Sequence, residues 1–303
     1  MQADPLSRAL DEAMAGRRGP LFDLLSRGSR LPGPRANGAL AEAFAQACRS
    51  RGGRADGVAL AMARLSADEA PGATSLEFLP TCGVVALAAR ATADAAVRSG
   101  FVAELHTLAD DLRFRVREAV VDGLARIGAA VGDALVEETA SWMDGYFHAA
   151  AVVRALARES WLTQLHVADG PVRRLDEAFA LAKGAPRAAA RYPGHKALLE
   201  ALAEAPPRVA LRFGIPVLDL LDRWAAVKDP VLRELVATLL ADGKLAGRFR
   251  PELEGVRRTL AATEPPVRNP DHDHGPSRDR SGARRAGKGG ARAARAAKAR
   301  TRR

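Results

Sequence analysis

Apolar residues recur at helical spacing along most of the chain, and most regularly between Asp110 and Val131. Five of them are separated by steps of four, four, three and four, which places them on one face of an α-helix: Val116, Val120, Leu124, Ile127 and Val131. The segment before them, about 94–109, carries a similar stripe. The pattern therefore predicts two antiparallel helices joined by an acidic turn at Asp110-Asp111.

The same spacing continues on both sides of this pair, with Pro or Gly at nearly every junction. The chain is also rich in Ala, Leu and Arg, which favour helix, and poor in aromatic residues. The predicted fold class is therefore all-α, with one helical body over residues 4–263. Besides the pair, we expect helices at about 5–15, 20–27, 39–50, 56–65, 80–91, 134–143, 146–158, 171–183, 195–204, 206–213, 216–227, 230–241 and 251–262.

Two segments of the body resemble each other in sequence. DDLRFRVREAVVDGL (110–124) and KDPVLRELVATLL (228–240) both have an acidic turn, then Arg-Glu, then an apolar stripe. Their Arg-Glu pairs lie 116 residues apart, which is close to three periods of about 39, a length typical of paired-helix repeats. One such repeat cannot bury its own apolar face, so stacking of repeats would create the core.

The tract DLRFRVREAVVDGLARIG, residues 111–128, resembles the second helix of a HEAT repeat. The resemblance extends over about 94–160 and 206–262. It implies a right-handed α-solenoid of antiparallel helix pairs. It also implies that an Asp in each turn and an Arg in the second helix hydrogen-bond to hold the pair. The matching residues are Asp110 or Asp111 with Arg117, and Asp229 with Arg233.

The net charge of +10 is concentrated at one end of the sequence. Residues 265–303 hold twelve basic and three acidic residues, whereas the other 264 residues hold 34 basic and 33 acidic residues. From residue 264 the chain has almost no large apolar side chains, so it cannot bury enough surface to offset its ordering entropy. We therefore expect residues 264–303 to form a separate, disordered basic tail.

The end of this tail, residues 284–303, contains nine basic residues and no acidic one. Such a segment neutralises phosphates without reading base sequence, which predicts nonspecific contact with DNA or RNA. In composition it resembles the tails of bacterial nucleoid-associated proteins. The alternatives are an idle solubilising extension and an acidic membrane or protein partner. The candidate nucleic-acid-binding residues are Arg284, Arg285, Lys288, Arg292, Arg295, Lys298, Arg300, Arg302 and Arg303.

The histidines predict no metal site. His272 and His274 in DHDHG are suitable ligand types, but no rigid element and no further Cys or His lies near them, which favours a solvated linker. The other four fit no ligand spacing and are interpreted as helix-surface or junction residues: His106, His148, His166 and His195. The sequence contains no P-loop and no GxSxG motif, and no cofactor is expected.

One enzymatic alternative follows from the HEAT-like resemblance, because bacterial alkylpurine DNA glycosylases share that fold. They place Trp, Asp and Arg around a damaged nucleotide, where a carboxylate and aromatic faces stabilise a positively charged sugar. The neighbouring residues do not reproduce that family's pattern, so no catalytic residue is assigned. We interpret the tryptophans as core or junction residues. The candidates are Trp142 with Asp144, Trp161, and Trp224 with Asp229.

The arginines of the body are candidates to line a concave face, but because the body is nearly neutral we favour a solvated face or one on which they pair with acidic residues across repeats. They occur as Arg113-Arg115-Arg117, Arg173-Arg174, Arg208-Arg212 and Arg257-Arg258.

Cys48 and Cys82 lie among apolar residues, which predicts two buried free thiols in a reducing compartment. The first residues show no signal-peptide pattern, and no run of about 18 apolar residues occurs. We therefore expect a cytoplasmic protein without a membrane span, associated with the nucleoid if the tail binds DNA.

Together these features favour a binding protein over an enzyme. The helical body would offer an extended surface to an unidentified protein partner, and the tail would add nonspecific affinity for nucleic acid. The alternative is a HEAT-like DNA glycosylase acting on alkylated bases. A third reading is a protein-only scaffold whose tail has no role.

Overall fold

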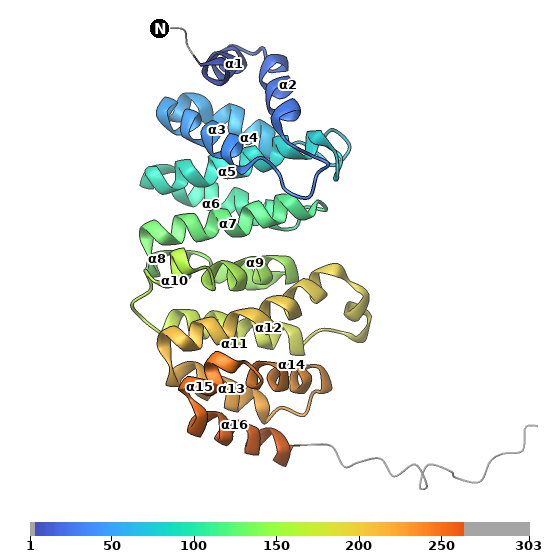
Figure 1. Cartoon of the computed structure of the whole chain (residues 1–303), viewed down its shortest axis with the longest axis vertical. Helices are drawn as coiled ribbons and strands as arrows, with labels where there is room; N and C mark the ends of the chain where they lie inside the picture. The colour runs from blue at the N-terminus through green and yellow to red at the C-terminus, as the bar shows by residue number, and fades with distance from the viewer. Residues whose placement is uncertain (1–3, 264–303) are drawn as a thin grey trace, which may run out of the picture. The chain divides into compact units, whose positions relative to one another are not determined.

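The structure of the protein is a computed structural model, and it describes residues 4–263 (Figure 1). These residues form sixteen α-helices, three short 3₁₀ helices and no β-strand, so the predicted all-α class is confirmed for this part of the chain. The helices are α1 (Pro5–Met14), α2 (Gly19–Gly28), α3 (Gly38–Arg51), α4 (Gly53–Ala63), η1 (Ser75–Glu77), α5 (Phe78–Ala93), α6 (Ala95–Ala109), α7 (Phe114–Val131), α8 (Asp133–Glu138), η2 (Ala140–Asp144), α9 (Tyr146–Leu156), α10 (Glu159–Leu162), α11 (Asp169–Lys183), η3 (Arg187–Arg191), α12 (Pro193–Phe213), α13 (Ile215–Ala225), α14 (Pro230–Leu240), α15 (Gly243–Arg248) and α16 (Arg250–Ala262).

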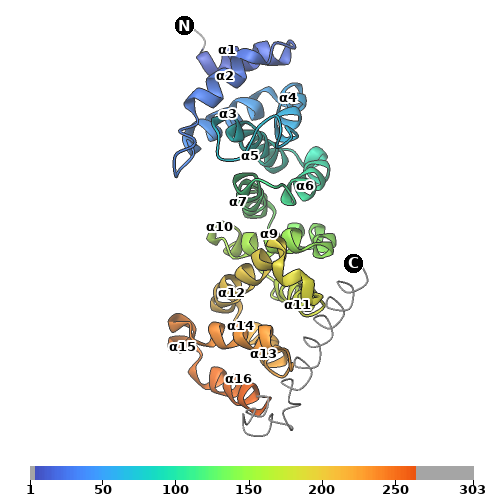
Figure 2. The same cartoon turned by 90° about the vertical axis from the view of Figure 1, so that its right-hand side faces the viewer.

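The helices of residues 4–263 follow one another along the long axis of this body (Figure 1). One row consists of α3, α5, α7, α9, α12 and α14, and each of these helices contacts the next. A second row consists of α4, α6, α11 and α13, and each of these contacts at least two helices of the first row. Figure 2 shows the partners α6 and α7, and likewise α11 and α12, side by side. From α3 to α7 and from α11 to α14, successive helices thus alternate between two packed rows.

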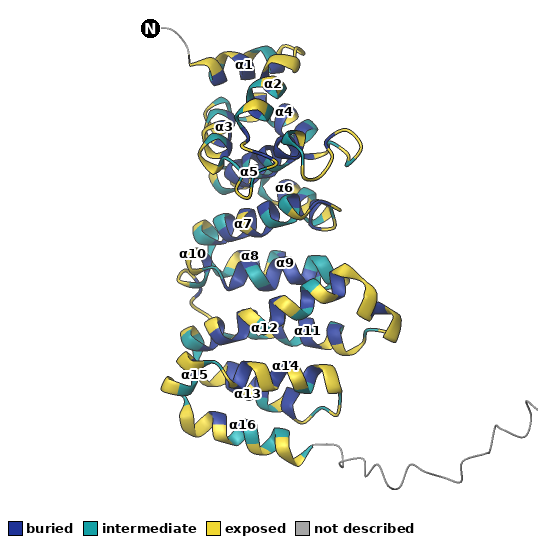
Figure 3. Ribbon diagram, turned by 45° about the vertical axis from the view of Figure 1, so that its right-hand side comes forward, coloured by how far each residue is buried: buried dark blue, intermediate teal, exposed yellow. Residues whose placement is uncertain are grey.

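The apolar core runs through the middle of the stack from α1 to α16 (Figure 3). Helix α9 joins its two halves, because opposite sides of this helix pack in different directions. Ala151, Val152 and Leu156 pack towards the N-terminal half, whereas Ala149 and Val153 pack towards the C-terminal half. A helix with apolar residues on two sides has to be covered on both, which fits the position of α9 between the two halves of the core.

Helix α7 shows why the clearest sequence stripe is the best guide to the fold. Val116, Val120, Leu124 and Ile127 are fully buried, as the spacing predicts. On the same helix, a Cβ at Gly128 would overlap the ring of Trp161, so only a glycine lets α10 pack this closely against α7. The stripe therefore sets which side of α7 faces its neighbours, and the glycine sets how near one of them comes.

The segment Ser75–Ala93 is long enough to span a membrane and has a mean hydropathy of 1.3, which is in the range of membrane-spanning helices. The sequence pattern alone did not identify this segment as a candidate span. However, 72% of its apolar window is buried within the body. Helices α3, α4, α6 and α7 all contact α5. The single arginine of α5, Arg90, is buried and forms ion pairs with Asp56 at 2.7 Å and with Asp94 at 3.3 Å. The apolar composition of α5 is that of a core helix.

Three helix predictions need correction. The segments 195–204 and 206–213 form one helix, α12, which continues through Pro206 and Pro207. A proline inside a helix removes a hydrogen bond, but the buried apolar side of α12, which packs on α9, favours an unbroken helix. The segment 134–143 divides into α8 and η2, and the short helices α10 and α15 were not predicted.

The two cysteines are buried free thiols, as predicted. Burial raises the pKa of Cys48 to about 12 and raises the pKa of Cys82 well above its usual value. Because the thiolate is the reactive form, neither thiol should be alkylated by iodoacetamide in the folded protein at pH 8, whereas both should react in urea. Mass spectrometry measures the label on each peptide. Labelling of either thiol faster than the body unfolds would contradict this prediction.

Candidate functional site

The acidic turn between α6 and α7 is held by a different arginine from the one that the HEAT resemblance implies. The carboxylate of Asp111 accepts two hydrogen bonds from Arg113, at 2.6 and 2.8 Å. Arg117 reaches the backbone carbonyl of Asp111, and Asp110 is exposed. The reason is geometric: Arg113 precedes the helix, so its guanidinium can turn back onto the carboxylate two residues before it.

Arg113 also ties this turn to the chain that follows α4. Its side chain is buried, and it donates to the carbonyls of Leu65, Ser66 and Ala70 at 2.7 to 3.2 Å. A planar guanidinium has enough donors to serve a carboxylate and several carbonyls at once. Arg113 is therefore a structural residue that joins two helix pairs.

The second implied pair, Asp229 with Arg233, is also used differently. The carboxylate of Asp229 caps α14 by accepting from the backbone N–H groups of Val231 and Leu232, both at 3.0 Å. Arg233 donates to the hydroxyl of Thr263 at the end of α16. The acidic residue starts one helix, and the arginine holds that helix to a later one.

The other clustered arginines of the body mostly contact neighbouring elements. Arg173 forms ion pairs with Glu137 at 3.2 Å and Asp169 at 2.8 Å. Arg115 and Arg257 also form ion pairs, with Glu77 at 3.7 Å and Glu254 at 2.7 Å. Several arginines donate in addition to backbone carbonyls of other elements: Arg115 to Gly33, Arg208 to Ala157, Arg212 to Leu165 and Arg257 to Leu240. Pairing with acids was expected, but these carbonyl contacts depend on where each helix ends, which a charge pattern does not show.

The tryptophans lie in the core. Trp142 and Trp161 are almost completely buried, and the indole N–H of Trp161 donates to the carbonyl of Gly132. Trp224 is 9% exposed, stacks on Phe179 and donates to Asp176 at 2.7 Å. An extruded base needs an accessible aromatic face, so these indoles do not support a glycosylase site.

An exposed surface on the first row of helices carries three adjoining hollows, and we call it the row surface. The first hollow, of about 270 Å³, lies over α3, α5 and α7. The second, of about 210 Å³, lies over α7, α9 and α12, and the third, of about 50 Å³, lies between α9 and α12. Phe114 and Glu118 line both the first and second hollows, and Arg154 lines both the second and third. The hollows therefore form one continuous surface.

The row surface combines exposed apolar side chains with paired charges. Phe114 is 61% exposed, and the guanidinium of Arg117 lies 4.4 Å from the ring centre of Phe147. Burial lowers the pKa of Arg117, although neighbouring acids, chiefly Asp111, act in the opposite direction. Glu118 on α7 forms an ion pair with Arg154 on α9. The charges of this surface largely neutralise one another across adjacent helices.

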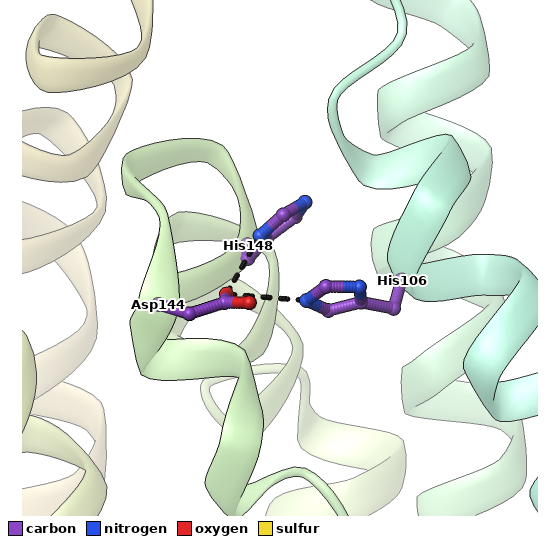
Figure 4. Close-up of side chains that lie close together, drawn as sticks. All are labelled: His106, Asp144 and His148. Atoms are coloured by element: carbon purple, nitrogen blue, oxygen red, sulfur yellow. Dashed lines mark hydrogen bonds and ion pairs between the residues drawn. The ribbon is translucent and has the colours of Figure 1, made fainter.

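Two histidines that are 42 residues apart in sequence meet at one carboxylate (Figure 4). His106 lies on α6, whereas Asp144 ends η2 and His148 lies one helical turn later on α9. Oδ1 of Asp144 is 3.1 Å from Nε2 of His106 and 2.8 Å from Nδ1 of His148. We call these three residues the His–Asp–His cluster. The buried ring of Trp142 packs edge-on against both imidazoles.

The cluster changes the acidity of its carboxylate. Burial alone would raise the pKa of Asp144, but hydrogen bonds from His106 and His148 outweigh it, so the pKa lies below its ordinary value. The two His–Asp contacts require hydrogen on Nε2 of His106 and on Nδ1 of His148. The sequence could have suggested Asp144 and His148, since they are only four positions apart and His148 lies in the first turn of α9, but it gives no sign of His106.

The predicted nucleic-acid-binding residues, Arg284 to Arg303, and the pair His272 and His274 lie outside the described residues. Comparison of the chain with protein-family models, with curated proteins and with solved structures gives no match. The function is therefore inferred from the surfaces and side-chain clusters of the chain itself.

Proposed function

We propose that this protein is a non-catalytic, cytoplasmic binding protein. Its residues 4–263 form a HEAT-like, right-handed α-solenoid that binds a macromolecular partner on the row surface. Its basic residues 284–303 add nonspecific affinity for DNA or RNA. The observation that supports the body's role best is the continuity of three hollows across five helices of the first row, α3, α5, α7, α9 and α12, with Phe114, Glu118 and Arg154 shared between hollows.

The size of the hollows favours a macromolecular partner over a small ligand. Small-molecule pockets usually enclose about 300–1,000 Å³. None of the three hollows of the row surface reaches that range, with about 270, 210 and 50 Å³. Together, however, they extend from α3 to α12. A protein segment that places one apolar side chain in each hollow would use the whole surface.

The charges of the row surface favour a protein rather than a nucleic acid. Glu118 and Asp122 on α7 face Arg154 on α9 and Arg158, which caps α10, with 3.0 Å between Arg158 and Asp122. Such pairing neutralises Arg154 and Arg158 and so lowers the affinity of this surface for phosphates. Contact with nucleic acid is therefore assigned to the tail, where nine basic residues occur without an acidic one.

Three features support the HEAT-like part of the proposal. Successive helices alternate between two packed rows over α3–α7 and α11–α14, the sequences 110–124 and 228–240 resemble each other, and residues 111–128 resemble the second helix of a HEAT repeat. Arginines that join one helix pair to the next, such as Arg113 and Arg173, fit stacked units that share a core.

Phe114→Ser is expected to reduce partner binding by at least about tenfold, because this exposed ring lines two hollows of the row surface. Val167→Ser is the matched control, since Val167 is similarly exposed, at 56%, and lines none of the three hollows. Nuclease-treated extracts are passed over the full chain and both variants, and bound proteins are quantified. If all three retain the same proteins equally, the row surface is not the binding site.

A further inference from the structure

The His–Asp–His cluster brings together three side chains that can bind a metal ion, although their spacing in the sequence matches no metal-binding motif. The three ligand atoms, Nε2 of His106, Nδ1 of His148 and a carboxylate oxygen of Asp144, all lie within 4.8 Å of one another. They come from helix α6 and from the η2–α9 segment, which contact each other (Figure 4). The groups are therefore held by two separate rigid elements.

The distances fit a small divalent ion. Zinc binds imidazole nitrogen and carboxylate oxygen at about 2.0–2.2 Å, which puts neighbouring ligand atoms of a tetrahedral site about 3.3 Å apart. Here the oxygen of Asp144 is 3.1 Å from one imidazole nitrogen and 2.8 Å from the other. Small movements of the side chains would therefore open the space that an ion needs.

The donor set selects the class of metal. Imidazole nitrogens suit zinc and its transition-metal neighbours, whereas magnesium and calcium prefer oxygen ligands. The side chain of Asp144 is 53% exposed, so an ion bound there would be open to water on one side. Three protein ligands with one open position is a coordination pattern that zinc adopts in proteins.

The surroundings of the cluster favour a prepared site over an accidental meeting of surface residues. The imidazoles are partly covered, with 27% of the His106 side chain and 16% of the His148 side chain exposed. The buried indole of Trp142 lies against both rings, 5.1 Å from the centre of His106 and 6.3 Å from that of His148. Packing of this kind restricts the rotation of ligand rings and keeps their nitrogens directed at Asp144.

We propose that His106, Asp144 and His148 bind one Zn²⁺ ion, which has a water molecule as its fourth ligand and links α6 to α9. When the ion binds, the hydrogen on Nε2 of His106 and the hydrogen on Nδ1 of His148 each move, by exchange with solvent, to the other nitrogen of the same ring, so that both coordinating nitrogens are free and both imidazoles stay neutral. The ion thereby joins two successive helix pairs. This site is independent of the row surface and of the tail.

The test is calorimetric titration of the full chain with ZnCl₂ at pH 7.5. The background carries His272→Gln and His274→Gln, so that these two residues cannot contribute binding. We expect one Zn²⁺ per chain. His106→Gln, His148→Gln and Asp144→Asn should each weaken binding by at least about 100-fold, more than the loss of an outer partner of a ligand costs. His166→Gln is the control, since His166 is exposed and lies outside the cluster, and it should bind like the background.

Absence of Zn²⁺ binding by the background chain, or equal binding by the background and His148→Gln, would overturn the proposal. Two measurements on the unaltered cluster cover the case in which a variant fails to fold. Free Zn²⁺ at 100 times its Kd should raise the folding equilibrium constant about 100-fold. Anomalous scattering from a zinc-soaked crystal should place the ion about 2.0–2.2 Å from all three ligand atoms, and an ion located elsewhere would overturn the proposal.

Discussion

Replacing the nine basic residues of 284–303 by Gln is expected to weaken binding to duplex DNA at least about 100-fold at 50 mM salt. The unaltered chain should lose about 10³–10⁵ in affinity between 50 and 200 mM salt, because each neutralised phosphate releases counterions. The Gln variant should show almost no salt dependence, since the rest of the chain is nearly neutral. Fluorescence anisotropy with a labelled duplex of random sequence measures both effects, and labelled RNA should give the same result.

A chain in which residues 284–303 are shuffled is the matched control for this experiment. It keeps the charge and changes the order, so a segment that does not read base sequence should bind as before. Equal affinities of the unaltered chain and the Gln variant would assign DNA binding to the body or remove it. In that case the reading of the tail as an idle extension, or as a ligand for acidic proteins or membranes, would replace the proposal.

Arg113→Ala should have the largest effect on stability of any single arginine substitution in the α6–α7 pair, about 3–5 kcal/mol. The substitution removes both side-chain hydrogen bonds to the carboxylate of Asp111, whose side chain is 13% exposed, and leaves it only the hydrogen bond from the backbone N–H of residue 113. It also frees three carbonyls of the chain after α4. The midpoint of urea unfolding, followed by circular dichroism at 222 nm, measures the loss.

Arg126→Ala is the control on the same helix pair. Arg126 forms two hydrogen bonds to Glu42, at 2.7 and 2.8 Å, but both side chains are substantially exposed, so its removal should cost no more than about 1 kcal/mol. Arg113→Lys keeps the charge and loses the planar fork, and its stability should lie between those of the two Ala variants. A similar midpoint for Arg113→Ala and Arg126→Ala would show that the buried network contributes little.

The row surface and the His–Asp–His cluster are suited to different ligands, a protein segment and a metal ion. The row surface lies on the first row of helices and combines accessible apolar side chains, such as Phe114, with charges that are paired across helices. The cluster joins α6 to the η2–α9 segment and offers nitrogen and carboxylate ligands. The two proposals are tested with different variants and different probes, so a negative result for the row surface does not contradict the zinc site, and the reverse also holds.

The three tryptophans on which the glycosylase alternative depended are buried in the folded body. Trp142 packs against two histidines, Trp161 fills the space next to Gly128, and Trp224 stacks on Phe179. Each indole is covered by other side chains and so serves packing. Asp144, which was paired with Trp142 in that alternative, instead belongs to the His–Asp–His cluster.

The sequence by itself determined the helical class and the buried side of the main helices. Four of the five residues of the stripe on α7, up to Ile127, are buried as its spacing predicts, because a period of 3.6 residues is a local property of the helix; the fifth, Val131, is partly exposed at the helix end. The sequence also showed that the excess of positive charge lies in the tail, since charge is counted residue by residue. It also predicted the buried thiols of Cys48 and Cys82 from their apolar neighbours.

Only the tertiary structure decided which residues meet. The proline pair in α12 predicted a break, but packing of that helix on α9 favours its continuity. Arg113, and not Arg117, holds the carboxylate of Asp111. His106 reaches Asp144 across 38 positions of sequence. Such contacts depend on the rotation of each helix about its axis and on how neighbouring helices cross. These quantities are set by the packing of the whole core and are not encoded in any local period.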